Sequence, residues 1–205
     1  MAARGTMPVK GAPPDAAPFR SLALEAAIEK LPGTGNCILD LGPGIAANIE
    51  FLLRFSSRVH VADLFDTLET LIADASAVND EGACCPLPSE LLPAPPGRGF
   101  DLVLAWTLFD YIPPDELPRL ADRLRTIGSP RLLVHALIST QARIPRVPHA
   151  FRIEPGGIAM RRRTDEERVG PRQGLTRLME RFPGFRVSRS ILLRNGLQEY
   201  LLEPS

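Results

Sequence analysis

The segment at residues 37–53, CILDLGPGIAANIEFLL, decides the expected fold. An apolar run ends at Asp40, a Gly-Pro-Gly turn follows, and apolar residues then recur at helical spacing. Gly42 and Gly44 carry no Cβ, so a ligand can lie against the backbone where this strand ends. The segment therefore predicts a strand, a ligand-binding turn and a helix.

The remainder of the chain alternates short apolar segments with helix-like segments. The expected strands are 37–41, 58–64, 100–106 and 131–138, and a less distinct one is placed at 83–86. The expected helices are 18–33, 45–55, 66–77, 113–127 and 174–185. This alternation is typical of an α/β fold, a doubly wound and mainly parallel sheet with helices on both faces.

The C-terminal end shows a different pattern. Two strand-like runs flank Asn195-Gly196 within 186–203. Asn-Gly is a strong hairpin signal because both central turn positions need φ above zero. The sheet is therefore expected to finish with an antiparallel hairpin.

Length and composition favour one domain. The chain has 205 residues, which suits a disordered arm at 1–18 followed by a single domain at 19–205. No apolar run reaches the roughly 20 residues that a membrane helix needs. The three cysteines, of which Cys84 and Cys85 are adjacent, make a poor disulfide framework and favour a cytoplasmic location. No zinc-type cysteine motif is present, and no metal is expected.

The charge is unevenly distributed. Residues 1–139 carry 11 basic and 17 acidic side chains, whereas residues 140–205 carry 13 basic and 7 acidic ones. We expect 139–171 to form a mobile cover over the carboxyl edge of the sheet, with Arg161, Arg162 and Arg163 contacting an acceptor. A solvated surface without a ligand is the simpler alternative.

A second acid favours one cofactor class. Asp63 ends the expected second strand, 19 residues after Gly44, where a carboxylate can bind a ribose diol. Both a dinucleotide and S-adenosylmethionine fit a glycine turn followed by an acid. Asp40 would repel the phosphates of a dinucleotide, but it is compatible with the cationic ammonium and sulfonium groups of S-adenosylmethionine. The acid before the turn therefore favours the latter.

At these residues the chain resembles the class I S-adenosylmethionine-dependent methyltransferases. ILDLGPG is similar to their first motif, VHVADL to their second strand, and the closing hairpin to their reversed seventh strand. The resemblance implies a Rossmann-like single-domain fold, S-adenosylmethionine as cofactor, and methyl transfer. The residues that it implies at the cofactor are Asp40, Gly42 and Gly44 beside the methionine part, Asp63 on the ribose, and Ala105 and Trp106 along the pocket.

The chain departs from this family at two places. Ala46 stands at the third glycine position, and 83–93 offers no clear strand and no acid beyond Glu90 for the adenine amine. A second hypothesis is therefore a catalytically inactive protein of the same fold that acts as a partner or regulatory subunit. An NAD(P)-dependent oxidoreductase is a third hypothesis, which Asp40 and the hairpin disfavour.

The acceptor and the catalytic residue are not marked by a motif. Displacement at a sulfonium needs alignment more than special side chains. Asp110 and Tyr111, which follow the strand at 100–106, and His149 are candidate catalytic residues, with capping, packing or no role as alternatives. His135 is expected to be a hydrogen-bonded core residue. We expect a small-molecule acceptor, because the length leaves no room for a recognition domain, and no nucleic-acid signature is present. The oligomeric state is not indicated.

Overall fold

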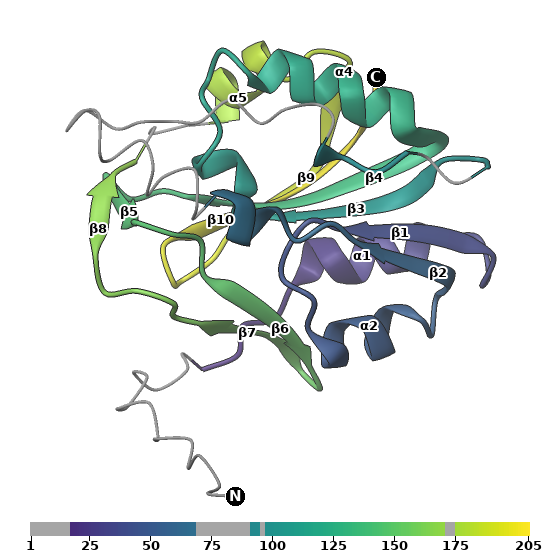
Figure 1. Cartoon of the computed structure of the whole chain (residues 1–205), viewed down its shortest axis with the longest axis horizontal. Coiled ribbons are helices and arrows are strands. Elements are labelled where there is room, and N and C mark those ends of the chain that lie inside the picture. Colours follow the sequence, from purple (N-terminus) through teal and green to yellow (C-terminus); the bar gives the residue numbers. More distant parts are fainter. Residues whose placement is uncertain (1–16, 69–90, 95–96, 171–174) are drawn as a thin grey trace, which may run out of the picture.

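A six-stranded sheet forms the centre of the molecule (Figure 1). The computed structural model describes residues 17–68, 91–94, 97–170 and 175–205. Within them the sheet has the order β2-β1-β3-β4-β10-β9, in which the first four are parallel and β10 is antiparallel to both neighbours. The strands are β1 (Asn36–Asp40), β2 (Ser56–Val61), β3 (Phe100–Trp106), β4 (Gly128–Ser139), β9 (Phe185–Leu192) and β10 (Leu197–Pro204). The expected mainly parallel sheet is confirmed.

Helices cover both faces of this sheet. Figure 1 shows α1 and α2 on one side and α4 and α5 on the other. Their bounds are α1 (Leu22–Lys30), α2 (Ala46–Leu52), α4 (Leu117–Ile127) and α5 (Leu175–Arg181), with a 3₁₀ turn η2 (Leu108–Asp110). The predicted helix at 66–77 is seen as helical residues 64–68, where the described residues stop. The strand proposed at 83–86 and nearly all of the N-terminal arm lie outside the described residues.

The C-terminal hairpin forms as expected. Strands β9 and β10 pair antiparallel, and Gly196 between them has a φ of 80°. The Asn195 side chain accepts a hydrogen bond from the Leu197 N–H at 3.2 Å, which closes the turn. The reversed strand β10 thus lies between β4 and β9.

One strand boundary differs from its prediction in a way that affects the site. The expected second strand extended to residue 64, but β2 ends at Val61. Asp63 follows in a turn with a φ of 43°, a left-handed conformation that β structure does not allow. The acid therefore lies beyond the strand instead of at its last position.

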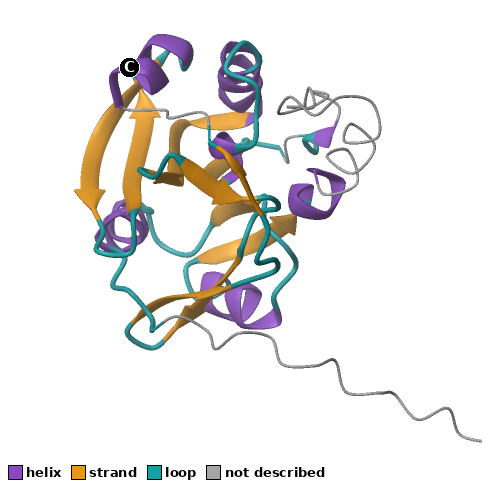
Figure 2. Ribbon diagram, turned by 90° about the vertical axis from the view of Figure 1, so that its left-hand side faces the viewer, coloured by secondary structure: helices purple, strands orange, loops and turns teal. Residues whose placement is uncertain are grey.

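Residues 143–169, here named the cover, contain strands that the sequence did not reveal. The sequence predicted a mobile cover at 139–171; within that range the chain forms two small antiparallel sheets, β5 (Arg143–Pro145) with β8 (Glu167–Val169) and β6 (Ala150–Glu154) with β7 (Gly157–Arg161). Figure 2, which faces the carboxyl edge of the main sheet, shows these short strands in front of it. The strands are three to five residues long and interrupted by prolines, so alternation alone gives too weak a signal.

Contacts from α2 and from the segment before α1 fasten the cover to the main domain. The Asn48 side chain in α2 donates to the Phe151 carbonyl at 2.8 Å and accepts from the Ile153 N–H at 2.7 Å. Phe19 and Ile158 form an isolated antiparallel bridge. Asn48 is 1% exposed, so this buried amide is matched to the backbone of β6. None of the described helices is long and apolar enough to span a membrane.

Candidate cofactor and acceptor site

The reversal of strand order places the candidate site. β1 has β2 on one side and β3 on the other, and ligands of such sheets bind at the carboxyl ends beside this reversal. The glycine turn follows β1 directly, and Asp40 pairs in register with Leu104 of β3. The turn, the Asp63 segment and the end of β3 therefore meet at one edge.

Asp40 is buried at the start of the glycine turn. Its Oδ1 accepts hydrogen bonds from the Gly42 N–H at 2.9 Å and from the Trp106 indole N–H at 2.7 Å. Its Oδ2 is also buried but has no hydrogen-bond partner among the described residues. Burial raises the pKa of Asp40 to about 6, although the bonds from Trp106 and Gly42 lower it. A carboxylate with one unused oxygen is suited to a cationic or N–H donor ligand.

Trp106 lies across the glycine turn. A Cβ on Gly42 would fall 2.7 Å from the indole Cδ1 and 2.8 Å from Nε1, so only glycine fits beneath this ring. Trp106 itself has a φ of 49°, a strained conformation that is concentrated at functional sites. The sequence left open whether Trp106 borders a pocket or packs in the core. The Trp106 side chain is 1% exposed, and it is buried beside the glycine turn. Ala105, the other predicted border residue, is fully buried at the end of β3.

Asp63 reaches the same turn from the β2 side. Its Oδ1 is buried without a hydrogen-bond partner in the part of the chain described. Burial and then the neighbouring Asp66 raise the pKa of Asp63. At Gly44 a Cβ would meet only Val61 Cγ1, at 3.7 Å, so this side of the turn is open. Asp63 thus directly precedes the helical residues 64–68 and carries a carboxylate oxygen that lacks a partner among the described residues.

The cover packs directly onto this edge through Phe151. The Phe151 ring stacks on Trp106 with centroids 5.4 Å apart and an angle of 5° between the planes. The Asn48 clamp fixes the backbone of Phe151, so the ring is held over the indole by α2. Phe151 was not among the predicted site residues, since an aromatic residue in a proline-rich stretch carries no positional signal.

Asp110 and Tyr111, two of the candidate catalytic residues, are both buried. Asp110 Oδ2 accepts from the Ser139 N–H at 2.8 Å, and burial raises the pKa of Asp110 to about 7. The Tyr111 hydroxyl donates to the Pro145 carbonyl at 3.0 Å, and Arg168 lies 5.1 Å from its ring centroid. Both residues therefore help to join the end of β3 to β4 and the cover.

His149 and Thr107 lie close to Asp110 and Tyr111, around the same small cavity. His149, a candidate catalytic residue, lies in the loop before β6; it is only 7% exposed, and its Nδ1 has no partner within the described residues. Burial, and then Arg162, lower the pKa of His149 to about 4. Thr107, which the sequence did not single out, has the same exposure and an equally unpartnered Oγ1. The only sequence feature that could have marked Thr107 as a site residue is its position directly after β3.

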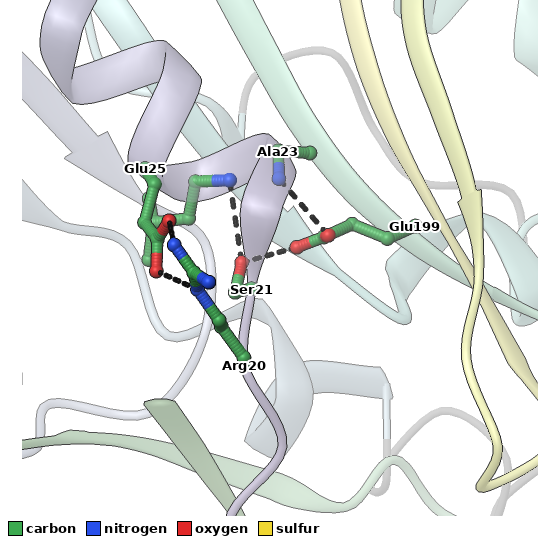
Figure 3. Close-up of polar contacts among 6 residues, drawn as sticks. Arg20, Ser21, Ala23, Glu25 and Glu199 are labelled. Carbon is green, nitrogen blue, oxygen red and sulfur yellow. Dashed lines mark hydrogen bonds and ion pairs between the residues drawn. The ribbon is translucent and has the colours of Figure 1, made fainter. Parts of the chain in front are cut away.

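A separate polar cluster anchors α1 to the sheet. Glu199 of β10 accepts hydrogen bonds from the Ser21 hydroxyl and from the Ala23 N–H, the latter at 3.0 Å (Figure 3). It also contacts His135 Nε2 at 2.8 Å. Ser21 in turn caps α1 by accepting from the Leu24 N–H at 3.2 Å. His135 is fully buried, so its expected role as a hydrogen-bonded core histidine is confirmed at Nε2.

The arginines of the cover make local ion pairs. Arg163 lies 2.7 Å from Asp66, and Arg162 lies 3.5 Å from Asp165. Arg163 thus links the cover to the Asp63 segment, whereas its expected contact with an acceptor stays a prediction. Cys84 and Cys85 lie outside the described residues.

Solved structures share this fold. The chain matches a methyltransferase dependent on S-adenosylmethionine from Clostridium acetobutylicum ATCC 824 with 14% identity, a TM-score of 0.55, and 89% of each chain covered. A protein from Pyrococcus horikoshii OT3 matches with 15% identity, a TM-score of 0.53, and coverage of 89% of this chain and 88% of its own. DhpI in complex with SAH matches with 17% identity, a TM-score of 0.51, and coverage of 89% and 82%.

The fold is that of the class I methyltransferases. This agrees with the strand order and with the reversed β10 between β4 and β9. No protein-family model and no curated protein matches the sequence. The similarity therefore lies in the tertiary structure, at identities of 14 to 17% in these three matches.

Proposed function

We propose that this protein is a methyltransferase that uses S-adenosylmethionine and acts on a small-molecule acceptor. One observation carries the proposal: Asp40 and Asp63 converge on the glycine turn, each with a buried carboxylate oxygen that lacks a partner among the described residues. An unpaired buried acceptor is costly, so such oxygens indicate a ligand that donates to them. The ammonium and the ribose hydroxyls of S-adenosylmethionine supply such donors.

Each site residue has a proposed role at the cofactor. Asp40 is assigned to the cationic methionine end, Gly42 and Gly44 to backbone approach, Asp63 to the ribose, and Ala105 and Trp106 to the pocket border. The cofactor supplies a methyl group on a sulfonium sulfur, a reaction that needs alignment and partial exclusion of water. The cover and its Phe151 stack on Trp106 are suited to exclude water. A reducing cytoplasmic location accords with the three cysteines.

Calorimetry on the 205-residue chain tests the proposal. We expect saturable binding of S-adenosylmethionine and of its demethylated product, and no binding of NAD⁺. Trp106 is the only tryptophan, and its indole contacts Asp40, so its fluorescence should change on binding. Binding of NAD⁺ instead would contradict the assignment of Asp40.

A second candidate function follows from the position of the indole. Trp106 covers the face of Gly42 and already donates to Asp40, which leaves the methionine end of the pocket partly filled by the protein itself. This favours an inactive protein of the same fold that acts as a partner or regulatory subunit. Undetectable binding at millimolar S-adenosylmethionine, in the parent and in a Trp106→Ala variant, would support this candidate over the first. Binding only in the variant would show that the indole blocks the pocket.

A further inference from the structure

A cleft lies at the amino edge of the main sheet, at the end opposite the glycine turn. It has a volume of about 240 Å³, and its lining comes from the starts of β1, β2 and β3 and the turns before them. Gly35 and Cys37 belong to the central strand β1 and the residue before it, so β1 forms the floor. The neighbouring strands β2 and β3 supply the two walls.

Each wall carries an arginine that lines the cleft. Arg58 lies near the start of β2 and pairs in register with Cys37, and Arg98 lies in the turn before β3. Because β1 separates β2 from β3, the two walls are about 10 Å apart, which is two strand spacings. The two guanidinium groups therefore approach the same space from opposite sides of β1.

Neither guanidinium is neutralised by the protein. No carboxylate among the described residues forms an ion pair with Arg58 or Arg98. The one hydrogen bond of Arg98 is long, from Nη2 to the Gly35 carbonyl at 3.5 Å. A guanidinium has five N–H donors, so most donors of both side chains are unused.

Asp101 is the one acid in the lining, and its oxygens are already bonded. Oδ2 accepts from the Cys37 N–H at 2.9 Å, and Oδ1 accepts from the Ser129 hydroxyl at 2.8 Å. These two bonds hold the carboxylate at the sheet, where it joins β1 to the start of β4. The cleft thus retains two unpaired cationic side chains that are exposed to solvent.

The turn that carries Arg98 is fixed by its glycines. Gly97 and Gly99 have φ values of 37° and 90°, in the left-handed region that favours glycine. A Cβ on Gly99 would fall 2.6 Å from the carbonyl carbon of Gly128, so this side of the turn packs tightly against β4. A Cβ on Gly97 would meet nothing within 4 Å, so the other side is open. The backbone therefore holds Arg98 at the mouth of the cleft.

We propose that this cleft binds the phosphate group of a small phosphate monoester, with Arg58 and Arg98 as its two cationic contacts. Guanidinium groups on opposite walls need an anion with more than two terminal oxygens, since a single guanidinium can occupy both oxygens of a carboxylate. A phosphate monoester has three such oxygens and nearly two negative charges at neutral pH, and it can pair with both arginines at once.

The inference does not rest on the proposed methyltransferase function. The five residues of β1 separate this cleft from the glycine turn by about 15 Å, at roughly 3.3 Å for each residue. A ligand in the cleft and a cofactor at the carboxyl edge can therefore be bound together.

Calorimetry with probes of one framework tests the anion class. Phenyl phosphate, phenyl sulfate, benzoate and benzyl alcohol are titrated into the 205-residue chain at low salt and about pH 8, where the phosphate is a dianion. We expect saturable binding of phenyl phosphate with a dissociation constant on the order of a millimolar. Sulfate and benzoate should bind about tenfold more weakly or less, and the alcohol not at all. Equal affinity for sulfate or benzoate, or no binding of phenyl phosphate, would overturn the proposal.

Variants assign the binding to the two arginines. Arg58→Gln and Arg98→Gln each remove one charge-assisted contact and should weaken phenyl phosphate binding about tenfold or more at unchanged Tm. Arg189→Gln is the matched control, because Arg189 is an exposed arginine of β9 at the far edge of the sheet. Loss of binding in the control, or full binding in both of the other variants, would overturn the proposal.

Cys37 provides a local measurement, since it is partly exposed and lines the cleft. Replacing Cys84 and Cys85 by serine leaves Cys37 as the only thiol of the chain. Saturating phenyl phosphate should slow alkylation of Cys37 by iodoacetamide several-fold, and Arg58→Gln combined with Arg98→Gln should abolish this protection. Binding without protection would place the probe elsewhere and overturn the proposal.

Two competitors distinguish this site from other phosphate sources and from the cofactor site. Phenyl phosphate affinity should be unchanged at saturating S-adenosylmethionine, and displacement would overturn the separate site. If S-adenosylmethionine itself does not bind, the methyltransferase proposal fails and the phosphate site stands. Single-stranded DNA that binds more tightly than phenyl phosphate, and depends on Arg58 and Arg98, would assign the cleft to a nucleic-acid backbone and overturn the small ligand.

Discussion

Two fully buried carboxylates, Asp40 and Glu199, have opposite surroundings. The Glu199 carboxylate contacts Ser21, Ala23 and His135. Burial alone would raise the pKa of Glu199, but these hydrogen bonds have the larger combined effect, and its pKa is lowered. Asp40 has two donors on one oxygen and no partner on the other among the described residues, and burial raises its pKa to about 6.

The difference separates a structural acid from a ligand-binding acid. A buried carboxylate with all its partners inside the protein stabilises the fold, because removing it leaves several donors unpaired. A buried carboxylate with an unused oxygen costs stability in the free protein and is suited to bind a donor. The Glu199 cluster and the Asp40 turn should therefore respond oppositely to substitution.

The largest effect is expected at Glu199. Glu199→Ala would leave the Ser21 hydroxyl, the Ala23 N–H and His135 Nε2 buried without their acceptor, at a cost of about 3–5 kcal/mol. Thermal unfolding should show a fall in Tm of about 6–20 °C. Glu203→Ala is the control on the same strand, since its pairs with the solvent-exposed side chains of Lys30 and Arg186 are each worth about 1 kcal/mol or less. Equal losses in the two variants would contradict the structural role of Glu199.

Asp63→Asn should weaken cofactor binding with little change in stability. An amide still caps the helix at residue 64, but it loses the charge-assisted bonds to a ribose, worth about 1.5–3 kcal/mol. Affinity for S-adenosylmethionine should fall roughly ten- to a hundredfold, measured by calorimetry beside Tm. Asp66→Asn, which removes the neighbouring carboxylate paired with Arg163 and keeps the Asp63 carboxylate, serves as the comparison. Unchanged affinity in Asp63→Asn would remove Asp63 from the site.

The two glycines of the turn should differ in their tolerance of alanine. A Cβ at Gly42 would clash with the indole at 2.7 Å, which should cost about 1–3 kcal/mol, whereas a Cβ at Gly44 meets only Val61 Cγ1 at 3.7 Å. Chemical unfolding should therefore show a loss for Gly42→Ala and almost none for Gly44→Ala. Adding Trp106→Leu should relieve the first loss in part, and absence of any relief would contradict the contact.

The smallest effect concerns the pH dependence of Asp40. Its pKa of about 6 in the folded chain exceeds the usual value near 3.9, so the folded state binds more protons between these values and stability falls as pH rises from about 4 to 6. Asp40→Asn removes this loss but buries an unpaired amide, so we expect a net gain of about 1 kcal/mol at pH 8.

Glu199 should change the stability in the opposite direction with pH. Its pKa is lowered in the folded chain, so the stability that it contributes is present above the usual pKa of glutamate and is lost as pH falls through the folded value. Tm should be measured from about pH 2 to 8, a range that includes the usual pKa values of both acids and the region below that of glutamate, for Asp40→Asn and Glu199→Gln beside the parent. Parallel pH profiles for the two variants would contradict the contrast between the two acids.

Local patterns in the sequence were sufficient for the sheet, the turn and the hairpin. The apolar run before Asp40 predicted β1, the glycines predicted the turn, and Asn195-Gly196 predicted the reversal before β10. These features depend on backbone freedom and on apolar periodicity, which neighbouring residues determine. The position of β1 beside the reversal of strand order then made Asp40 and Asp63 candidates for one site.

Only the tertiary structure decided what lies against that turn. The Trp106 indole over Gly42, the Phe151 ring over Trp106 and the clamp from Asn48 join segments up to about a hundred residues apart. The burial of His149 and Thr107 likewise depends on the cover folding onto the end of β3. Contacts between distant segments leave no periodic signal in a single sequence, because each segment alone is compatible with many partners. The sequence by itself thus determined where a ligand can bind, and the packing of the cover decided which side chains surround it.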